Sequence, residues 1–250
     1  MLYTSINNEK IKKLSKLKIK KERDKENLFL VEGSHLVKEA YNSGYLKELF
    51  ILDGNDFSLP VNINYISMNV LKYLSNVDSP SGIIGLCEKK QMKLDDDRIL
   101  ILDSIQDPGN LGTIIRSCVA FNINNIVIND KCVDPFSSKV IRASQGMIFK
   151  VNIVKKDLTE YLKSIKGNIF IYGTKVINGK SLKTIEKKSK FAIIMGNEGN
   201  GVDNKLLDLC DDYIYIPMNN KCESLNVGVA TSIILYEFEV IWYVKNWFTS

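Results

Sequence analysis

The sequence is poor in the residues that bind metals or form disulfides. Its 250 residues include one histidine, His35, and five cysteines with no CxxC pair among them. A structural zinc site needs about four cysteine or histidine ligands at close spacing, and an odd number of thiols cannot complete a disulfide framework. We therefore expect no metal centre, and reduced thiols of the kind found in cytoplasmic proteins.

Long hydrophobic runs are also absent. The first ten residues, MLYTSINNEK, lack the apolar core of a secretory signal. The best candidate for a membrane span, residues 225–236, has twelve uncharged residues before Glu237 and Glu239 interrupt it. About 20 apolar residues are needed to cross a bilayer core of about 30 Å, so we predict no membrane segment.

The excess of positive charge lies at the N-terminal end. The formal net charge is +5, and residues 1–26 alone hold nine Lys/Arg against four Asp/Glu, which leaves 25 of each sign downstream. Ile11, Leu14 and Leu17 recur every three residues among lysines, which predicts one amphipathic helix over residues 11–25. A basic end on a neutral body favours a polyanion partner such as nucleic acid, with a solvated helix face as the alternative.

Two segments of alternating strand and helix patterns flank a charged stretch. Residues 28–87 predict a small α/β domain, and the stretch EKKQMKLDDDR at 88–98 has only two apolar residues, which is typical of a linker. We divide the chain into residues 1–90, a linker at 91–98 and residues 99–250.

The segment 99–250 is rich in nearly continuous β-branched runs. Such runs, with helical stretches between them, predict a parallel sheet with helices on both faces. We expect strands at residues 99–102, 126–128, 151–154, 169–172, 191–195 and 214–216. Residues 224–248 are apolar almost all round, which predicts a helix buried in the domain or against a second subunit.

The first of three notable loops lies within residues 101–121. A strand ends at Asp103, and a turn ending at Asn110 leads into a helix expected to begin near Gly112. Ligands of open α/β sheets bind at such carboxyl ends of strands, although Asn110 also suits a plain helix N-cap. Arg116, on the first turn or two of the helix, opposes the helix dipole unless it meets an anion; a solvated arginine is the alternative.

The other two loops follow the strands at 191–195 and 214–216. Gly196, Gly199 and Gly201 permit close approach of the backbone to a ligand, or simply a tight turn. The pattern is neither GxGxxG nor GK[ST], and the carboxylate within it would repel a pyrophosphate, which disfavours a dehydrogenase or an NTPase. In the third loop Ser224 suits the N-cap of the last helix, and Asn226 needs hydrogen-bond partners if buried.

Together, in this order and spacing, the loops resemble the three motifs of the SpoU (TrmH-like) family of RNA ribose 2′-O-methyltransferases in the SPOUT superfamily. Residues 107–116, 196–202 and 216–230 resemble the first, second and third motif. Residues 135–146 are similar to the family's connecting segment. Residues 10–87 resemble the small substrate-binding domain, related to a ribosomal-protein RNA-binding fold, that many members carry.

Two positions depart from the family's third motif. Asn220 stands for a glycine, and asparagine is the non-glycine residue that best tolerates positive φ. Gly228 stands for a serine, which removes a hydroxyl and costs about 1 kcal/mol of helix propensity. Roles of that serine therefore do not carry over to this chain.

The resemblance implies an α/β fold whose parallel sheet ends in a C-terminal trefoil knot, preceded by a small α/β RNA-binding domain. It implies S-adenosylmethionine as the methyl donor, no metal, RNA as the substrate and a homodimer. The implied cofactor contacts are Thr174, Gly196, Gly201, Ile216, Met218 and Leu225.

The implied reaction is an in-line attack of a ribose 2′-oxygen on the sulfonium methyl. The resemblance gives catalytic roles to Asn110, Arg116, Glu198, Ser224 and Asn226. A free guanidinium has a pKa above about 12 and is not a base, so we expect Arg116 mainly to bind an RNA phosphate and stabilise the developing alkoxide. The other four would order the arginine, the loops and the target ribose.

The identity of the RNA stays open at this point. An N-terminal RNA-binding domain favours ribosomal RNA, 23S above all, because compact members without it commonly act on transfer RNA. The alternatives are a tRNA 2′-O-methyltransferase and a catalytically idle RNA-binding or ribosome-assembly protein of the same fold. The presence of Asn110, Arg116 and Asn226 argues against the idle protein.

Overall fold

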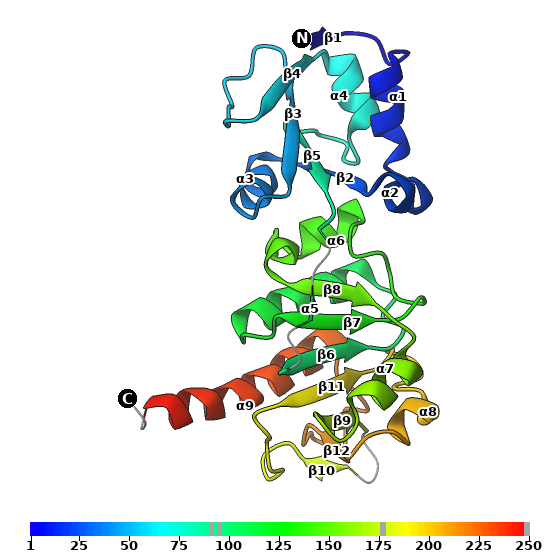
Figure 1. The fold of residues 1–250 in the computed structure, drawn as a ribbon, viewed down its shortest axis with the longest axis vertical. Helices are drawn as coiled ribbons and strands as arrows, with labels where there is room; N and C mark the ends of the chain where they lie inside the picture. Colours follow the sequence, from blue (N-terminus) through cyan, green and yellow to red (C-terminus); the bar gives the residue numbers. More distant parts are fainter. Residues whose placement is uncertain (91–92, 95–96, 176–178, 248–250) are drawn as a thin grey trace. The chain divides into compact units, whose positions relative to one another are not determined.

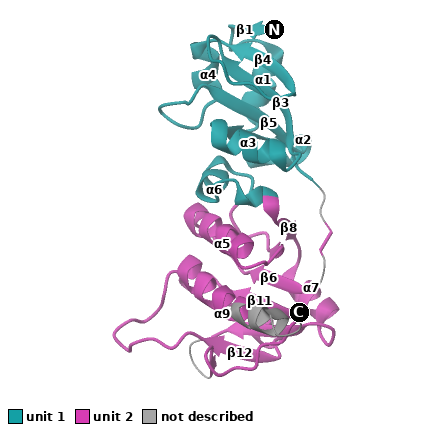
Figure 2. Ribbon diagram, turned by 90° about the vertical axis from the view of Figure 1, so that its left-hand side faces the viewer, with its two compact units in different colours: residues 1–91, 134–149 teal, residues 92–133, 150–250 magenta. Residues whose placement is uncertain are grey.

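The computed structural model describes residues 1–90, 93–94, 97–175 and 179–247, with side-chain surroundings as far as residue 239. The chain forms two compact units, which Figure 2 shows in separate colours. The first comprises residues 1–91 and 134–149, and the second comprises residues 92–133 and 150–250.

The first unit is built on a five-stranded mixed sheet, as predicted for a small α/β domain. The strand order is β1 (Leu2–Tyr3), β4 (Asn62–Ile66), β3 (Leu46–Leu52), β5 (Ile83–Glu88) and β2 (Leu28–Glu32), with β5 antiparallel to both its neighbours. Its helices are α1 (Glu9–Lys16), α2 (Lys20–Glu26), α3 (Ser34–Asn42) and α4 (Met68–Leu74) (Figure 1). Side chains of α1 and α4 share a buried cluster with Phe50 and Ile84 of the sheet.

The prediction of one helix over residues 11–25 is wrong. The segment forms α1 and α2, and the chain turns at Leu17, Lys18 and Ile19. Arg23 is buried, and its Nη1 donates to the carbonyls of Leu17 and Lys18, both at 2.8 Å. These bonds satisfy carbonyls that a continuous helix would use internally, so the turn is stabilised. The predicted apolar stripe is nevertheless buried.

Residues 134–149, which contain α6 (Ser138–Ala143) and all but the last residue of a 3-10 turn (Met147–Lys150), complete the core of the first unit. Arg23 Nε donates to Asp134 Oδ2 at 3.0 Å, and both side chains are less than 10% exposed. Phe29 packs against Phe136 with ring centroids 4.9 Å apart and against Phe149 at 6.3 Å. The predicted division includes this stretch in residues 99–250, because spacing along the chain carries no sign of such docking.

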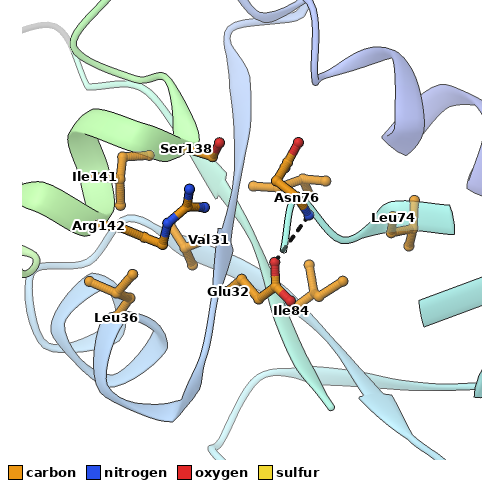
Figure 3. Close-up of a pocket in the computed structure, with 10 residues that line it drawn as sticks. Val31, Glu32, Leu36, Leu74, Asn76, Ile84, Ser138, Ile141 and Arg142 are labelled. Atoms are coloured by element: carbon orange, nitrogen blue, oxygen red, sulfur yellow. Dashed lines mark hydrogen bonds between the residues drawn. The ribbon is translucent and has the colours of Figure 1, made fainter. Parts of the chain in front are cut away.

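A small cavity lies where α6 meets β2 and α4 in this unit (Figure 3). Val31, Glu32, Leu74, Asn76 and Arg142 are among its lining residues, and the Asn76 backbone N–H donates to Glu32 Oε2 at 3.3 Å. Its volume is about 10 Å³, which is room for one water at most. The cavity is therefore a packing gap and not a ligand site.

The second unit is a seven-stranded sheet in which every neighbouring pair is parallel, as predicted. Its order is β10 (Lys180–Ser181), β12 (Asp212–Tyr215), β9 (Phe170–Thr174), β11 (Phe191–Met195), β6 (Arg98–Leu102), β7 (Asn125–Ile128) and β8 (Asn152–Lys155). The helices α7 (Leu158–Ile165) and α8 (Asn204–Leu207) contribute to a cluster with one sheet face, and α5 (Pro108–Ala120) packs with α9 (Val227–Trp247) (Figure 1).

The last helix returns across the sheet after β12, which lies between the edge strand β10 and β9. Phe238 packs against Phe191 and Tyr172, with centroids 4.7 and 5.1 Å apart. Glu239, which is 4% exposed, accepts from Arg98 Nη1 at 2.7 Å and from Asn122 Nδ2 at 2.6 Å. This return from β12 to α5 fits the trefoil knot that the resemblance implies. The predicted apolar side chains beyond 239 lie outside the described residues.

The sequence also predicts no metal centre and no membrane segment, and the structure can be searched for both only within the residues that it describes. Among them, no cluster of three potential metal ligands occurs and no helix could cross a membrane. All five cysteines are free. Burial raises the pKa of the Cys87 and Cys118 thiols far above its usual range, so both stay protonated and unreactive, whereas Cys222 is exposed.

The buried Arg23–Asp134 pair should be a main determinant of the first unit's stability. Asp134→Ala leaves a buried guanidinium without its partner, which is expected to lower the free energy of unfolding by about 3–5 kcal/mol. Urea unfolding measures the loss. Glu160→Ala, which removes the exposed partner of Lys163, is the control and should leave the midpoint unchanged. A wild-type midpoint for Asp134→Ala would contradict this role.

Candidate functional site

Three loops meet at the carboxyl edge of the seven-stranded sheet. They follow β6, β11 and β12, and parallel strands all end at the same edge. The edge therefore gathers residues 103–107, 196–203 and 216–226, which lie far apart in the sequence. These are the three loops singled out above.

The first loop delivers Asn110 on the first turn of α5. The helix begins at Pro108 and not near Gly112 as predicted, because Asp107 is its N-cap and accepts from the Asn110 N–H at 2.8 Å. Proline at the first helical position supports this early start. The N-cap reading of Asn110 is therefore wrong, and its side chain is available for other contacts.

The glycine loop after β11 is a tight, closed turn. Asn197 and Gly201 exchange two backbone hydrogen bonds, at 3.0 and 2.8 Å. Asn197 Oδ1 accepts from the Gly199 N–H at 2.9 Å, and its Nδ2 donates to the Ser104 carbonyl at 3.0 Å. A Cβ on Gly196 would lie 2.1 Å from the carbonyl carbon of Gly201, so only glycine fits there. Gly201 has φ +68°, which also favours glycine.

The third loop ends at Asn226, which caps α9. Its Oδ1 accepts from the backbone N–H groups of Gly228 and Val229, at 3.0 and 3.3 Å. The prediction that Ser224 caps this helix is wrong: Ser224 is exposed and lies three residues before α9 begins. Asn226 is exposed, so the condition of burial is not met, but its side chain does lie in a hydrogen-bond network, as expected.

One hydrogen-bonded chain joins the three loops through their side chains. Asn226 Nδ2 donates to Asn110 Oδ1 at 2.8 Å, and Asn110 Nδ2 donates to Glu198 Oε1. Each amide is used as both donor and acceptor, which fixes its orientation. Three of the five predicted catalytic residues therefore touch one another, in what we call the amide chain.

Arg116 and Ser224 are not part of the amide chain. Arg116 is the ninth residue of α5, past the first two turns where it was predicted, because the helix begins earlier. Its side chain is exposed and has no hydrogen bond or ion pair with any residue that the structure describes. A guanidinium presented in this way is available to an external anion.

A cleft of about 640 Å³ opens beside the amide chain. We call it the loop cleft, because its walls are the ends of β9, β11 and β12 with the loops that follow. Glu198 and Ser224 contribute to its lining. All six predicted cofactor contacts also line it: Thr174, Gly196, Gly201, Ile216, Met218 and Leu225. The Thr174 hydroxyl already donates to the Ile194 carbonyl at 2.8 Å, so Thr174 also secures the edge of the sheet.

Sequence reasoning missed several residues of this cleft. Lys175 and Glu223 bring a cation and an anion to the lining, and Val227 and Ile234 bring apolar surface from α9. Lys175 directly follows Thr174 at a strand end, which was the available signal. Val227 lies in the stretch 216–230 that resembles the third motif, which was its signal. Ile234 carried no signal in the sequence, because its pattern is that of any buried helix face.

The structure shows the surroundings of Gly228 and the backbone conformation of Asn220, the two departures from the third motif. A Cβ on Gly228 would lie 3.0 Å from Thr113 Cγ2 and 3.1 Å from Thr113 Cβ, so glycine lets α9 close on α5. Ser117 and Ser232 hydroxyls meet at 2.6 Å in the same contact. Asn220 does not have a positive φ, so the expectation that it replaces glycine for that reason is wrong.

Comparison with known proteins gives a consistent family. Residues 97–236 match the model of the SpoU rRNA Methylase family, and residues 8–85 match the MRM3-like substrate binding domain. A relative 38% identical over 239 residues, covering 93% of this chain and 96% of its own, is the 23S rRNA (guanosine(2553)-2'-O)-methyltransferase RlmP of Bacillus subtilis.

Solved structures with the same architecture cover nearly the whole chain. A crystal structure of an RNA 2'-O ribose methyltransferase is 29% identical, with a TM-score of 0.79 and coverage of 95% of this chain and 98% of its own. An AdoMet-bound rRNA methyltransferase from Sinorhizobium meliloti is 26% identical, with a TM-score of 0.84 and coverage of 95% and 97%.

The glycine loop provides a matched pair of substitutions. Gly196→Ala forces a methyl group into the Gly201 backbone and should lower the affinity for S-adenosylmethionine at least about tenfold, as measured by calorimetry. Gly199→Ala adds the same methyl 3.4 Å from the Asn197 side chain, an ordinary contact, and should bind within about twofold of wild type. Equal affinities for the two variants would rule out a role for the loop's closure.

Proposed function

Because the chain belongs to the SpoU rRNA methylase family, we propose that it transfers the methyl group of S-adenosylmethionine to a ribose 2′-hydroxyl of 23S ribosomal RNA. The observation that carries this proposal is the amide chain of Asn226, Asn110 and Glu198 beside the loop cleft. It links one side chain from each of the three loops, which supports a shared role for them in catalysis.

The loop cleft suits S-adenosylmethionine. Its volume is in the range of small-molecule sites, and its lining combines backbone groups of the loops with the apolar side chains of Ile216, Leu225 and Val227. Backbone amides and carbonyls can hold the adenosine, and Lys175 and Glu223 can pair with the carboxylate and the amine of the methionine part. When bound, this donor supplies an activated methyl on a sulfonium.

The amide chain would orient the target ribose. Glu198 uses one carboxylate oxygen for Asn110, which leaves the other to accept a hydrogen bond from a ribose hydroxyl. Held in this way, the 2′-oxygen is positioned for an in-line attack. Arg116 would bind an RNA phosphate and stabilise the negative charge that develops on the oxygen, and Ser224 would contact the substrate at the rim of the cleft.

The first unit would hold the RNA at a basic face of α1 and α2. Lys10 is used by Glu48 at 2.6 Å, and Lys18 Nζ donates to the Tyr73 and Ser75 carbonyls. Lys25 pairs with Glu26 at 3.3 Å. The other lysines of α1 and α2 are exposed and lack hydrogen bonds and ion pairs to the residues described: Lys12, Lys13, Lys16, Lys20 and Lys21. Such unpaired cations are suited to phosphates.

A homodimer would cover the outer face of α9. Val229 and Tyr236, seven residues apart, are 47% and 54% exposed, and Tyr236 meets Phe121 edge-on at 5.8 Å. This apolar strip is what a two-fold helix contact would bury.

We also propose a cytoplasmic location, since the five free thiols suit a reducing compartment.

Transfer RNA is the alternative substrate. The matches over residues 8–85 and to an rRNA-modifying relative support ribosomal RNA. The test is transfer of radiolabelled methyl from S-adenosylmethionine to total RNA from a strain that lacks the protein, followed by separation of the RNA species. Label in 23S RNA is expected; label confined to transfer RNA would overturn the substrate, and no label in any RNA would overturn the activity.

Two substitutions test the proposed catalytic roles in that assay. Asn110→Ala breaks the amide chain and Arg116→Ala removes the free cation, and each should lower methyl transfer at least about a hundredfold without lowering the unfolding midpoint. Asn124→Ala, an exposed amide at the opposite sheet edge, should transfer at the wild-type rate. A near-normal rate of methyl transfer by the Asn110→Ala or the Arg116→Ala variant would contradict the catalytic role proposed for that residue.

The basic face is tested by changing Lys12, Lys13, Lys16, Lys20 and Lys21 together to Gln. We expect weaker RNA binding and a shallower dependence of affinity on salt, because fewer counterions are released, while the affinity for S-adenosylmethionine stays the same. The matched control removes five lysines that already have acidic partners, four of them exposed and Lys188 half-buried: Lys155, Lys163, Lys180, Lys188 and Lys190. Equal RNA affinities for the two variants would mean that the lysines of α1 and α2 form only a solvated face and do not bind RNA.

A further inference from the structure

A second pocket, of about 500 Å³, lies on the other side of the glycine loop from the loop cleft. Its lining combines the loop after β6, Lys131 after β7 and residues 200–204. We call it the polar pocket, because amides, carboxylates and an ammonium dominate its lining and no aromatic side chain contributes. Asn197, Asn200, Gly201, Val202 and Asn204 line both spaces, so the glycine loop and the residues that follow it are shared between them.

The floor of the polar pocket is rigid and strained. Asp103, which is 7% exposed, accepts from Ser104 Oγ and Asn129 Nδ2 at 2.8 Å and from the Asp203 N–H at 2.9 Å. Ser104 has φ +62°, a conformation that costs a serine energy and persists only where the surroundings enforce it. Its N–H is held by Asn129 and its carbonyl by Asn197.

The rim, in contrast, presents unused polar groups. The side chains of Gln106, Asn200 and Asn204 are exposed and make no hydrogen bond with residues that the structure describes, and Lys131 is free in the same sense. Carboxamides carry both a donor and an acceptor, which is what the edges of nucleobases and ribose hydroxyls require.

The charges of the pocket argue against a phosphate as its main ligand. Asp103 and Asp203 contribute two carboxylates against the single ammonium of Lys131. Asp103 is buried and both of its oxygens already accept hydrogen bonds, which disfavours coordination of a metal ion by this side chain. The lining therefore suits a neutral ligand with many hydrogen-bonding groups.

From these observations, and resting on the proposed function, we propose that the polar pocket binds the base and ribose of one nucleotide of the RNA substrate, next to the site of methyl transfer. The glycine loop then serves both spaces, with the methyl donor on one side and an RNA nucleoside on the other. The pocket reads hydrogen-bonding pattern, whereas the lysines of α1 and α2 supply charge.

The test is the affinity of the full-length protein for protein-free 23S ribosomal RNA, measured by filter binding over a series of salt concentrations. Gln106→Ala with Asn200→Ala should weaken binding about tenfold without changing the salt slope, because hydrogen bonds and not ionic contacts are lost. Gln106→Ala alone, which touches only the polar pocket, should weaken it several-fold with unchanged affinity for S-adenosylmethionine.

Asn124→Ala with Asn168→Ala is the matched control, since both are exposed amides at the amino edge of the same sheet, and it should bind as wild type does. An RNA affinity of the Gln106/Asn200 variant equal to this control would overturn the inference, and so would a loss accompanied by a shallower salt slope. Methyl transfer is assayed in parallel, so absence of transfer by the wild type would count against the proposed function and not against the pocket.

Discussion

The hydrogen bonds of Asn110 are the contacts on which the whole site depends. They join a residue of α5 to Glu198, 88 positions later, and to Asn226, 116 positions later. Only a sheet in which β6, β11 and β12 are parallel brings these positions to one edge. The caps at Asp107 and Asn226 then set where α5 and α9 begin, and Gly228 lets the two helices approach closely enough for the amides to meet.

The glycine loop has a separate physical role, because it lies between the loop cleft and the polar pocket and lines both. Its closure by the paired backbone bonds of Asn197 and Gly201 keeps it narrow, and Asn197 ties it to Ser104. A narrow wall allows two pockets of different chemistry to lie side by side, one with apolar surface from α9 and one almost wholly polar. The reacting atoms of a methyl transfer must be within about 3–3.5 Å, so the target ribose would lie on the loop-cleft side with the methyl donor and the polar pocket would hold a neighbouring nucleotide.

The strands, the parallel sheet and the lining of the loop cleft could be predicted from the sequence, because buried β-branched runs and the residues at their ends carry strong local signals. Helix boundaries could not: the break after Lys16 depends on Arg23 reaching back to two carbonyls, and α9 begins after Asn226 because that side chain and not Ser224 caps it. The docking of residues 134–149 on Phe29 and Arg23 is likewise a contact between distant segments, which periodicity does not record.

The central claim is that the methyl group goes to a ribose 2′-oxygen of ribosomal RNA, and the position of the label within the product tests it most directly. A 2′-O-methyl group removes the hydroxyl that alkali uses to cleave the adjacent phosphodiester bond. Labelled 23S RNA from the methyl-transfer reaction should therefore release its label as an alkali-resistant dinucleotide. Release of all the label in mononucleotides would place the methyl on a base and contradict the account.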